Sequence, residues 1–70
     1  MQLIVNGKEV EIDREIVKIG DLLGLLSIKR IPGMSIKVNG EPIRQTMWIK
    51  YPVFDGDVLD IYSSEEIIIK

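Results

Sequence analysis

The sequence predicts an α+β domain in which one main helix packs against a mixed sheet of four or five strands. Several short segments alternate apolar and polar residues with the two-residue period of a β-strand. One segment instead spaces its leucines and isoleucines by three and four residues, as a helix does. With 70 residues, the chain is long enough for one domain around one hydrophobic core.

The chain starts with a predicted β-hairpin. Residues 3–5 form its first strand, and Asn6-Gly7 supplies the two positive-φ positions of a tight turn. The return strand, residues 8–12, alternates apolar residues with lysine and glutamate, so one of its faces is expected to contact solvent.

A short helix is predicted after the hairpin, because four apolar residues fall on a single helical stripe. They are Ile19, Leu22, Leu23 and Leu26. Asp21 in the first turn suits the positive end of the helix dipole. No Ser, Thr, Asp or Asn stands at the expected N-cap, which leaves the start of the helix undefined to within one turn.

Two further alternating strands are predicted, MSIKVN in the middle of the chain and VLDIY near its end. Asn39-Gly40 gives a tight turn after the first of them, and the Asp-Gly-Asp sequence at 55–57 gives the turn before the second. The alternation directs Leu59 and Ile61 toward the core.

The stretch between these strands, residues 41–54, is predicted to be irregular. Pro42 and Pro52 each remove a backbone N–H donor and interrupt regular structure. A short strand at Ile43 and a helical turn near residues 45–48 are expected within the stretch.

The predicted core consists of the inward-facing apolar residues of these elements. They are Leu3, Val5, Ile19, Leu22, Leu23, Leu26, Ile36, Val38, Leu59 and Ile61.

The composition excludes several classes of chemistry. The chain has no cysteine and no histidine, which removes disulfides, thiolate nucleophiles, iron–sulfur clusters and Cys/His zinc sites. No paired acid and base can be named, so the protein is not expected to be an enzyme, and no catalytic, cofactor-binding or metal-binding residue is assigned. We interpret Asp55, Asp57 and Asp60 as turn and strand residues rather than as a metal site. Because there is no signal sequence and no apolar run of membrane length, the expected location is the cytoplasm.

The order of these segments resembles the small sulfur-carrier proteins of the ThiS/MoaD family, and ThiS more closely than MoaD. The resemblance is carried by the opening MQLIVNGKEVEI, the helix IGDLL, the strand and turn SIKVNG, Trp48 and the turn DGD. It covers residues 1–62 and implies that this range forms a β-grasp, or ubiquitin-like, domain. In that fold the first and last strands lie side by side at the centre of the sheet.

The chain departs from the family pattern at two places. Family members end in Gly-Gly, whose carboxylate is adenylated by an activating enzyme and converted to a thiocarboxylate. Counted from the DGD turn, the positions of that pair hold Ile67 and Ile68, and no Gly-Gly occurs among the 70 residues. The Pro-Arg that commonly precedes the tryptophan is replaced by Arg44-Gln45.

These departures favour a ThiS-like module that binds proteins and has lost the carrier chemistry. Its partner is expected to be a protein, such as an activating enzyme or a thiazole-synthase-like protein. The expected binding residues are apolar and face outward or belong to the tail. They are Ile4, Val58, Tyr62, Ile67, Ile68 and Ile69.

Two alternative functions remain open from the sequence. One is a working sulfur carrier in thiamin or molybdopterin biosynthesis that uses an unusual route. The other is contact with RNA or nucleotides, as in TGS β-grasp domains, for which the basic residues between Lys29 and Lys50, with Trp48 and Tyr51, are the support. The net charge of −2 argues against nucleic acid.

The C-terminal tail, residues 63–70, is predicted to be extended. Isoleucine has a high β-propensity, and Ile67, Ile68 and Ile69 follow one another directly. Strand addition through this tail would give weak self-association or a surface for a partner. The alternative is a frayed terminus, because the ends of small domains usually fray.

Overall fold

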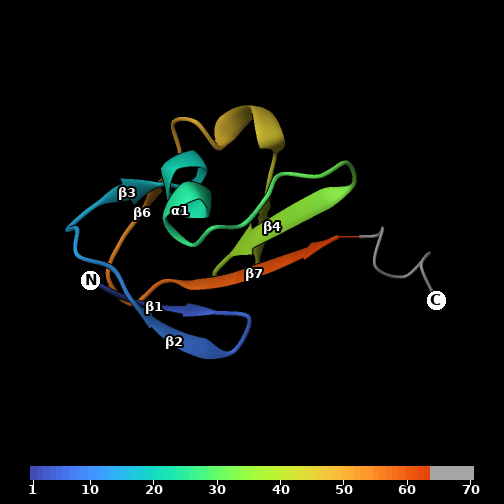
Figure 1. The fold of residues 1–70 in the computed structure, drawn as a ribbon. Coiled ribbons are helices and arrows are strands. Elements are labelled where there is room, and N and C mark those ends of the chain that lie inside the picture. Colours follow the sequence, from blue (N-terminus) through green and yellow to red (C-terminus); the bar gives the residue numbers. More distant parts are fainter. Residues whose placement is uncertain (64–70) are drawn as a thin grey trace.

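A five-stranded mixed sheet forms the body of the domain (Figure 1). The computed structural model describes residues 1–63, so most of the predicted extended tail lies outside the described residues. The strand order is β2-β1-β7-β4-β5, which places β7 in the middle. The bounds of the strands are Gln2–Val5 for β1, Lys8–Glu11 for β2, Met34–Val38 for β4, Glu41–Ile43 for β5 and Val58–Ser63 for β7.

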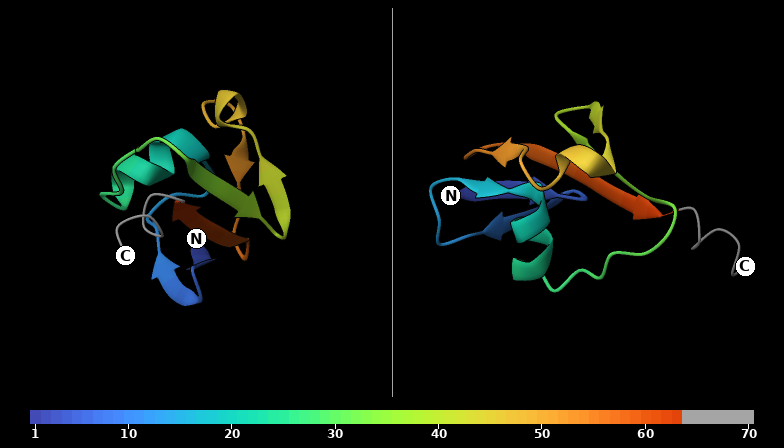
Figure 2. Two further views of the ribbon diagram at one scale, coloured as in Figure 1. Left: turned by 90° about the vertical axis from the view of Figure 1, so that its right-hand side faces the viewer. Right: turned by 90° about the horizontal axis from the view of Figure 1, so that it is seen from above.

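The remaining elements cover one face of this sheet (Figure 2). The main helix α1 spans Ile19–Leu25, and the 3₁₀ helix η1 spans Gln45–Met47. Two short strands, β3 at Val17–Lys18 and β6 at Pro52–Val53, pair antiparallel as a second small sheet. The prediction placed Pro52–Val53 in an irregular stretch and assigned no element to Val17–Lys18, because neither segment is long enough to display an alternating pattern.

The middle strand β7 is parallel to β1 and antiparallel to β4. Ile4 lies opposite Val58 in the parallel pair, and Ile36 lies opposite Ile61 in the antiparallel pair. The first and last strands therefore lie side by side, and the predicted mixed sheet of four or five strands with one main helix is confirmed, with five strands.

The first hairpin turn is also a contact to β7. Asn6 has φ 52° and Gly7 has φ 82°, as the predicted tight turn requires. The Asn6 N–H donates to the Leu59 carbonyl at 2.9 Å, and the Ile61 N–H donates to Asn6 Oδ1 at 2.7 Å. Asparagine is suited to this position because it tolerates positive φ and brings a side-chain acceptor.

The second tight turn contacts the start of β7 in a similar way. Asn39 has φ 53° and Gly40 has φ 84°. Asn39 Oδ1 accepts the Val58 N–H at 2.9 Å, and its Nδ2 donates to Asp57 Oδ1 at 3.1 Å. Both asparagines thus bind β7 to a neighbouring hairpin, Asn39 at the start of the strand and Asn6 at its middle.

The helix begins without a side-chain cap, as expected from its sequence. Its first free donors reach backbone carbonyls of another segment, since the Ile19 N–H donates to the Tyr51 carbonyl and the Gly20 N–H to the Trp48 carbonyl. These bonds are 3.0 Å and 2.9 Å long. The backbone carbonyls of the segment that follows η1 therefore accept the N–H groups that an N-cap side chain would otherwise bond.

The helix ends in a Schellman motif. The Ser27 N–H donates to the Gly24 carbonyl and the Ile28 N–H to the Leu23 carbonyl. Ser27 takes the left-handed position of this motif with φ 58°, where glycine is more usual.

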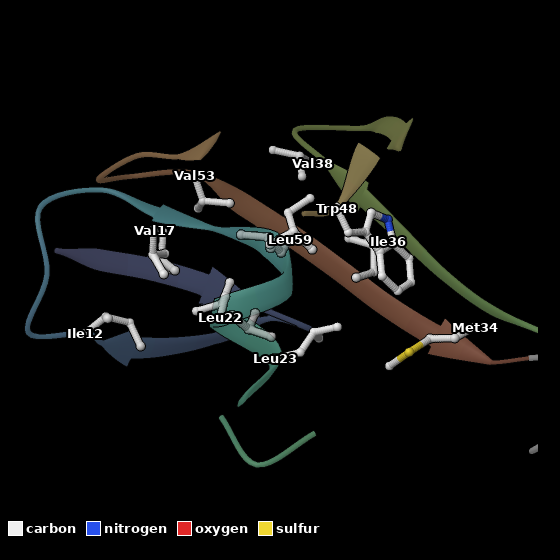
Figure 3. Packing of buried hydrophobic residues seen from close by; sticks show 13 residues of the cluster. Ile12, Val17, Leu22, Leu23, Met34, Ile36, Val38, Trp48, Val53 and Leu59 are labelled. Carbon is white, nitrogen blue, oxygen red and sulfur yellow. The ribbon is translucent and has the colours of Figure 1, made fainter. Parts of the chain in front are cut away.

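A single cluster of buried side chains joins the sheet, α1 and the irregular segments (Figure 3). All predicted core residues are buried except Leu26 and Ile61, which are half-buried and pack against the cluster. Leu26 is the C-cap residue of α1, where fewer neighbours cover it. The prediction did not include five further members of the cluster. They are Ile12, Val17, Met34, Trp48 and Val53.

Candidate functional site

The outward side of β1 and β7 carries the predicted partner-binding residues of the described chain. Ile4 and Val58 are direct cross-strand neighbours, and each is 37% exposed. Tyr62 is 48% exposed and lies on the same side of β7. Because four residues of a strand span about 13 Å, Tyr62 is separated from Val58, with Asp60 between them. The structure thus brings Ile4 and Val58 together and leaves Tyr62 apart.

Charged residues surround the apolar pair. Glu9 of β2 lies opposite Ile4, and Lys37 of β4 lies opposite Asp60 of β7. The open face thus carries two neighbouring apolar residues with charged residues beside them. The other predicted binding residues, Ile67, Ile68 and Ile69, lie outside the described residues.

A groove beside Tyr62 was not anticipated from the sequence. We call it the β5 groove; its volume is about 420 Å³, and Tyr62, Pro42, Ile43 and Arg44 are among its lining residues. It forms because β5 ends at Ile43, opposite Ile36, so that the first two residues of β4 have no partner on this side. Arg44 and Gln45, the pair that departs from the family pattern, are among the lining residues, but the sequence does not show where β5 ends.

Gln45 fills part of the missing strand position in this groove. Its Nε2 donates to the Met34 carbonyl at 3.2 Å, which satisfies an acceptor that a longer β5 would have paired. Gln45 itself is exposed.

A second depression lies on the other side of Tyr62, where β7 ends. We call it the β7-end hollow; its volume is about 260 Å³. Its apolar lining includes Ile28, Ile31 and Ile61, and its polar lining includes Asn6 and Lys29. Tyr62 and Met34 line both depressions, so the tyrosine stands between them.

The acidic turn before β7 serves the fold. Asp55 Oδ1 accepts the Gln2 N–H at 2.6 Å, and Asp57 Oδ2 accepts the Phe54 N–H at 2.9 Å. With Gly56 at φ 88°, the Asp-Gly-Asp turn is confirmed. Within residues 1–63, no three acidic side chains gather in a way that would hold a metal ion.

Trp48 is not available for base stacking, which the nucleic-acid alternative required. The side chain is fully buried, its Nε1 donates to the Ile43 carbonyl at 3.0 Å, and the Arg30 guanidinium lies 5.3 Å from the ring centroid. This tryptophan is a core residue that also holds η1 against the sheet. In the described part of the chain, no helix has the length and apolar character to cross a membrane.

The strand order, the central parallel pair and the single helix on one face define a sulfur-carrier-like β-grasp domain. The family model of ThiS matches residues 3–62, and the chain belongs to the ThiS family. The predicted resemblance is therefore confirmed. Sulfur carriers of this family are not themselves enzymes, and they act with partner proteins in sulfur transfer.

Solved structures agree with the family match. The chain is similar to the thiamine biosynthesis protein ThiS of Geobacter metallireducens in its crystal structure, with a TM-score of 0.83 and 28% identity over 90% of this chain and 93% of that one. A solution structure of a thiamine biosynthesis protein from Geobacter metallireducens gives a TM-score of 0.74 at 28% identity, covering 89% of this chain and 81% of that one. No curated protein matches the chain.

Proposed function

We propose that this protein is a ThiS-like docking module, which binds a protein partner through the open face of its sheet and does not carry sulfur. The observation that carries the proposal is the exposed pair Ile4 and Val58 on adjacent strands at the middle of that face. Covering this pair removes apolar surface from water, and the neighbouring tyrosine, Tyr62, is a residue type enriched at interface hot spots.

The expected partner is an activating enzyme or a thiazole-synthase-like protein. Family membership supports this choice, since proteins of this kind work with sulfur carriers. Ile67, Ile68 and Ile69 remain part of the proposed binding surface on the strength of their sequence alone.

The absence of sulfur transfer is proposed from the residues that replace the glycine pair. A chain end that enters another enzyme's site in extended form benefits from residues without Cβ atoms. Ile67 and Ile68, at the counted positions of the pair, are β-branched and bulky. Binding is retained in this proposal, and the transferable terminus is lost.

A working sulfur carrier is the second candidate. It is favoured by the family match and by the similarity to a thiamine biosynthesis protein along most of both chains. The two candidates share the docking face and differ in the chemistry of the terminus. Modification of the terminus therefore separates them.

The docking proposal is tested by titrating the protein against a purified ThiS-activating enzyme in a calorimeter. Ile4→Asp should weaken binding at least about tenfold, because it places a charge in an apolar contact that excludes water. Tyr62→Ser, at a more exposed position, should weaken binding by a smaller factor.

Ile49→Asp is the matched control. Ile49 is 75% exposed and lies beside Gly20 at the start of α1, on the covered side of the sheet. Its substitution should leave the dissociation constant within about twofold of wild type, since that change is under 0.5 kcal/mol. Equal affinity of folded Ile4→Asp and wild type would refute docking through this face.

A further inference from the structure

We propose that an extended basic segment of the partner protein binds to the free edge of β2 by strand addition. Two cationic side chains of that segment lie against Glu9 and Glu11, and one apolar side chain between them lies against Val10. This inference rests on the proposed docking function and names the chemistry of what docks. The free edge is continuous with the proposed docking face, because Glu9 lies opposite Ile4.

The backbone of β2 has unpaired groups along this edge. β2 is the outermost strand of the sheet and, in the described part of the chain, pairs only with β1 (Figure 1). Met1 and Ile12 exchange two backbone hydrogen bonds of 2.8 and 2.6 Å, which fixes the alternation of this antiparallel ladder. Counted back from that pair, the N–H and C=O groups of Val10 point to β1, whereas those of Glu9 and Glu11 point away from the sheet. Strand addition uses backbone groups of this kind.

The opposite edge of the sheet, at β5, is blocked. Val38 and Glu41 flank a two-residue turn and therefore form a hydrogen-bonded pair, so the same alternation turns the backbone of Pro42 outward. Proline has no N–H to donate, and natural sheets use it to protect an edge from pairing. An added strand is therefore expected at β2 and not at β5.

The side chains of β2 define the chemistry of the added strand. Glu9 lies opposite the exposed Ile4, and Val10 lies opposite the buried Leu3. The two glutamates of β2 therefore stand on the open face, while Val10 stands on the core face and is half-buried against the cluster of buried side chains. Among the described residues, neither glutamate has an ion pair. A segment that alternates basic, apolar and basic residues matches all three positions.

A second copy of this chain fits the free edge of β2 poorly. Two β2 strands that pair antiparallel with matching faces place glutamate opposite glutamate, and like charges in that position destabilise a sheet. Charged side chains on an edge commonly prevent self-pairing in this way. The same two negative charges attract a strand of opposite sign, so they discriminate between the two kinds of partner.

The experiment is a nuclear magnetic resonance titration of the full chain with short synthetic peptides. The probe has two lysines separated by one valine, flanked on each side by one threonine, and its ends are blocked. Amide exchange at Glu9 and Glu11 should slow about fivefold when about four-fifths of the chain is bound, because only the free fraction then exchanges. Amides of β4 and β5 should exchange as they do without peptide.

Two control peptides separate charge attraction from strand addition. The first replaces both lysines by glutamates and should bind about fivefold or more weakly than the probe at low salt. The second keeps both lysines but carries a methyl group on each of their backbone nitrogens, which removes the donors to β2. It should bind more weakly than the probe and leave the exchange at Glu9 and Glu11 unslowed.

Charge reversal at the edge supplies the second arm. The double variant Glu9→Lys and Glu11→Lys should reverse the preference, so that the glutamate peptide binds more tightly than the lysine peptide. The matched control is the double variant Asp21→Lys and Glu41→Lys. It changes the net charge by the same amount at two exposed acidic residues outside β2 and should keep the preference of the wild-type chain.

Any one of four results overturns the proposal. They are a lysine peptide that binds no better than the glutamate peptide, an N-methylated peptide that binds as well as the probe, a preference that survives Glu9→Lys with Glu11→Lys, and protected amides at Glu9 and Glu11 before any peptide is added. The last result would mean that a second copy or the chain's own residues already occupy the edge. Failure here with normal loss of affinity in Ile4→Asp rejects only this inference, whereas an unaffected Ile4→Asp rejects the proposed docking face itself.

Discussion

Replacing Trp48 by phenylalanine tests how the irregular segment is held to the sheet. The indole is fully buried, and its Nε1 donates to the Ile43 carbonyl at 3.0 Å. Phenylalanine keeps an aromatic ring but removes the donor, leaving a part-buried carbonyl without this partner. An unsatisfied buried group costs about 1–3 kcal/mol, and the smaller ring leaves additional empty volume.

The expected magnitude is large for a domain of this size. A 70-residue domain has a free energy of unfolding of about 4–10 kcal/mol. A loss of about 2 kcal/mol therefore removes a large share of the stability and lowers Tm by about 8–16 °C. Trp48→Ala should cost about 3–5 kcal/mol. With a wild-type free energy of unfolding at the low end of the range, this variant would be partly unfolded at room temperature.

Thermal unfolding followed by far-ultraviolet circular dichroism measures both variants. Arg30→Ala separates the stacking contact from the hydrogen bond, because it removes the guanidinium over the ring, with its aliphatic stem, and leaves the indole N–H in place. It should cost under about 1 kcal/mol. If Trp48→Phe melts within about 2 °C of wild type, which corresponds to under about 0.5 kcal/mol, the indole bond does not hold η1 in place.

Three further predictions concern the turns and the core, and all are measured by urea unfolding. Ser27→Gly should raise the free energy of unfolding by about 0.5–1 kcal/mol, because glycine adopts the observed φ of 58° without strain; a decrease would contradict the Schellman assignment. Asn39→Gly keeps the positive φ and removes both side-chain bonds to the start of β7, so it should cost about 1–2 kcal/mol; an unchanged midpoint would mean that these bonds do not stabilise the strand. Leu22→Ala should lower the free energy of unfolding by about 2–5 kcal/mol and Ile61→Ala by clearly less, because Leu22 is fully buried and Ile61 is half-buried. Equal losses would contradict this dependence on burial.

The predictable part of the fold was the part with strong local patterns. Asn6-Gly7 and Asn39-Gly40 fixed two hairpin turns, and the Ile19 to Leu26 stripe located the helix. Trp48 and Val53 joined the core without such a pattern, since they lie in short segments whose burial depends on contacts far along the chain. No sequence period can show that the Tyr51 and Trp48 carbonyls accept the first two N–H donors of the helix.

The candidate site was also predicted only in part. Alternation placed Ile4 and Val58 on the outward side of adjacent strands, and their pairing followed from the fold that the resemblance implied. The β5 groove and the β7-end hollow could not be predicted, because each depends on where neighbouring elements stop. The end of β5 at Ile43 leaves the first residues of β4 uncovered, and Gln45 fills part of that space.

The central claim, docking without sulfur transfer, is tested most directly by intact mass spectrometry. The 70-residue protein is incubated with a ThiS-activating enzyme, ATP and a sulfur donor, and a carrier with a Gly-Gly terminus is treated alongside as the positive control. The account predicts that the control gains the mass of a thiocarboxylate while this protein keeps its mass, although it binds the activating enzyme. A thiocarboxylate mass gain on this protein would contradict the account and identify it as a working sulfur carrier.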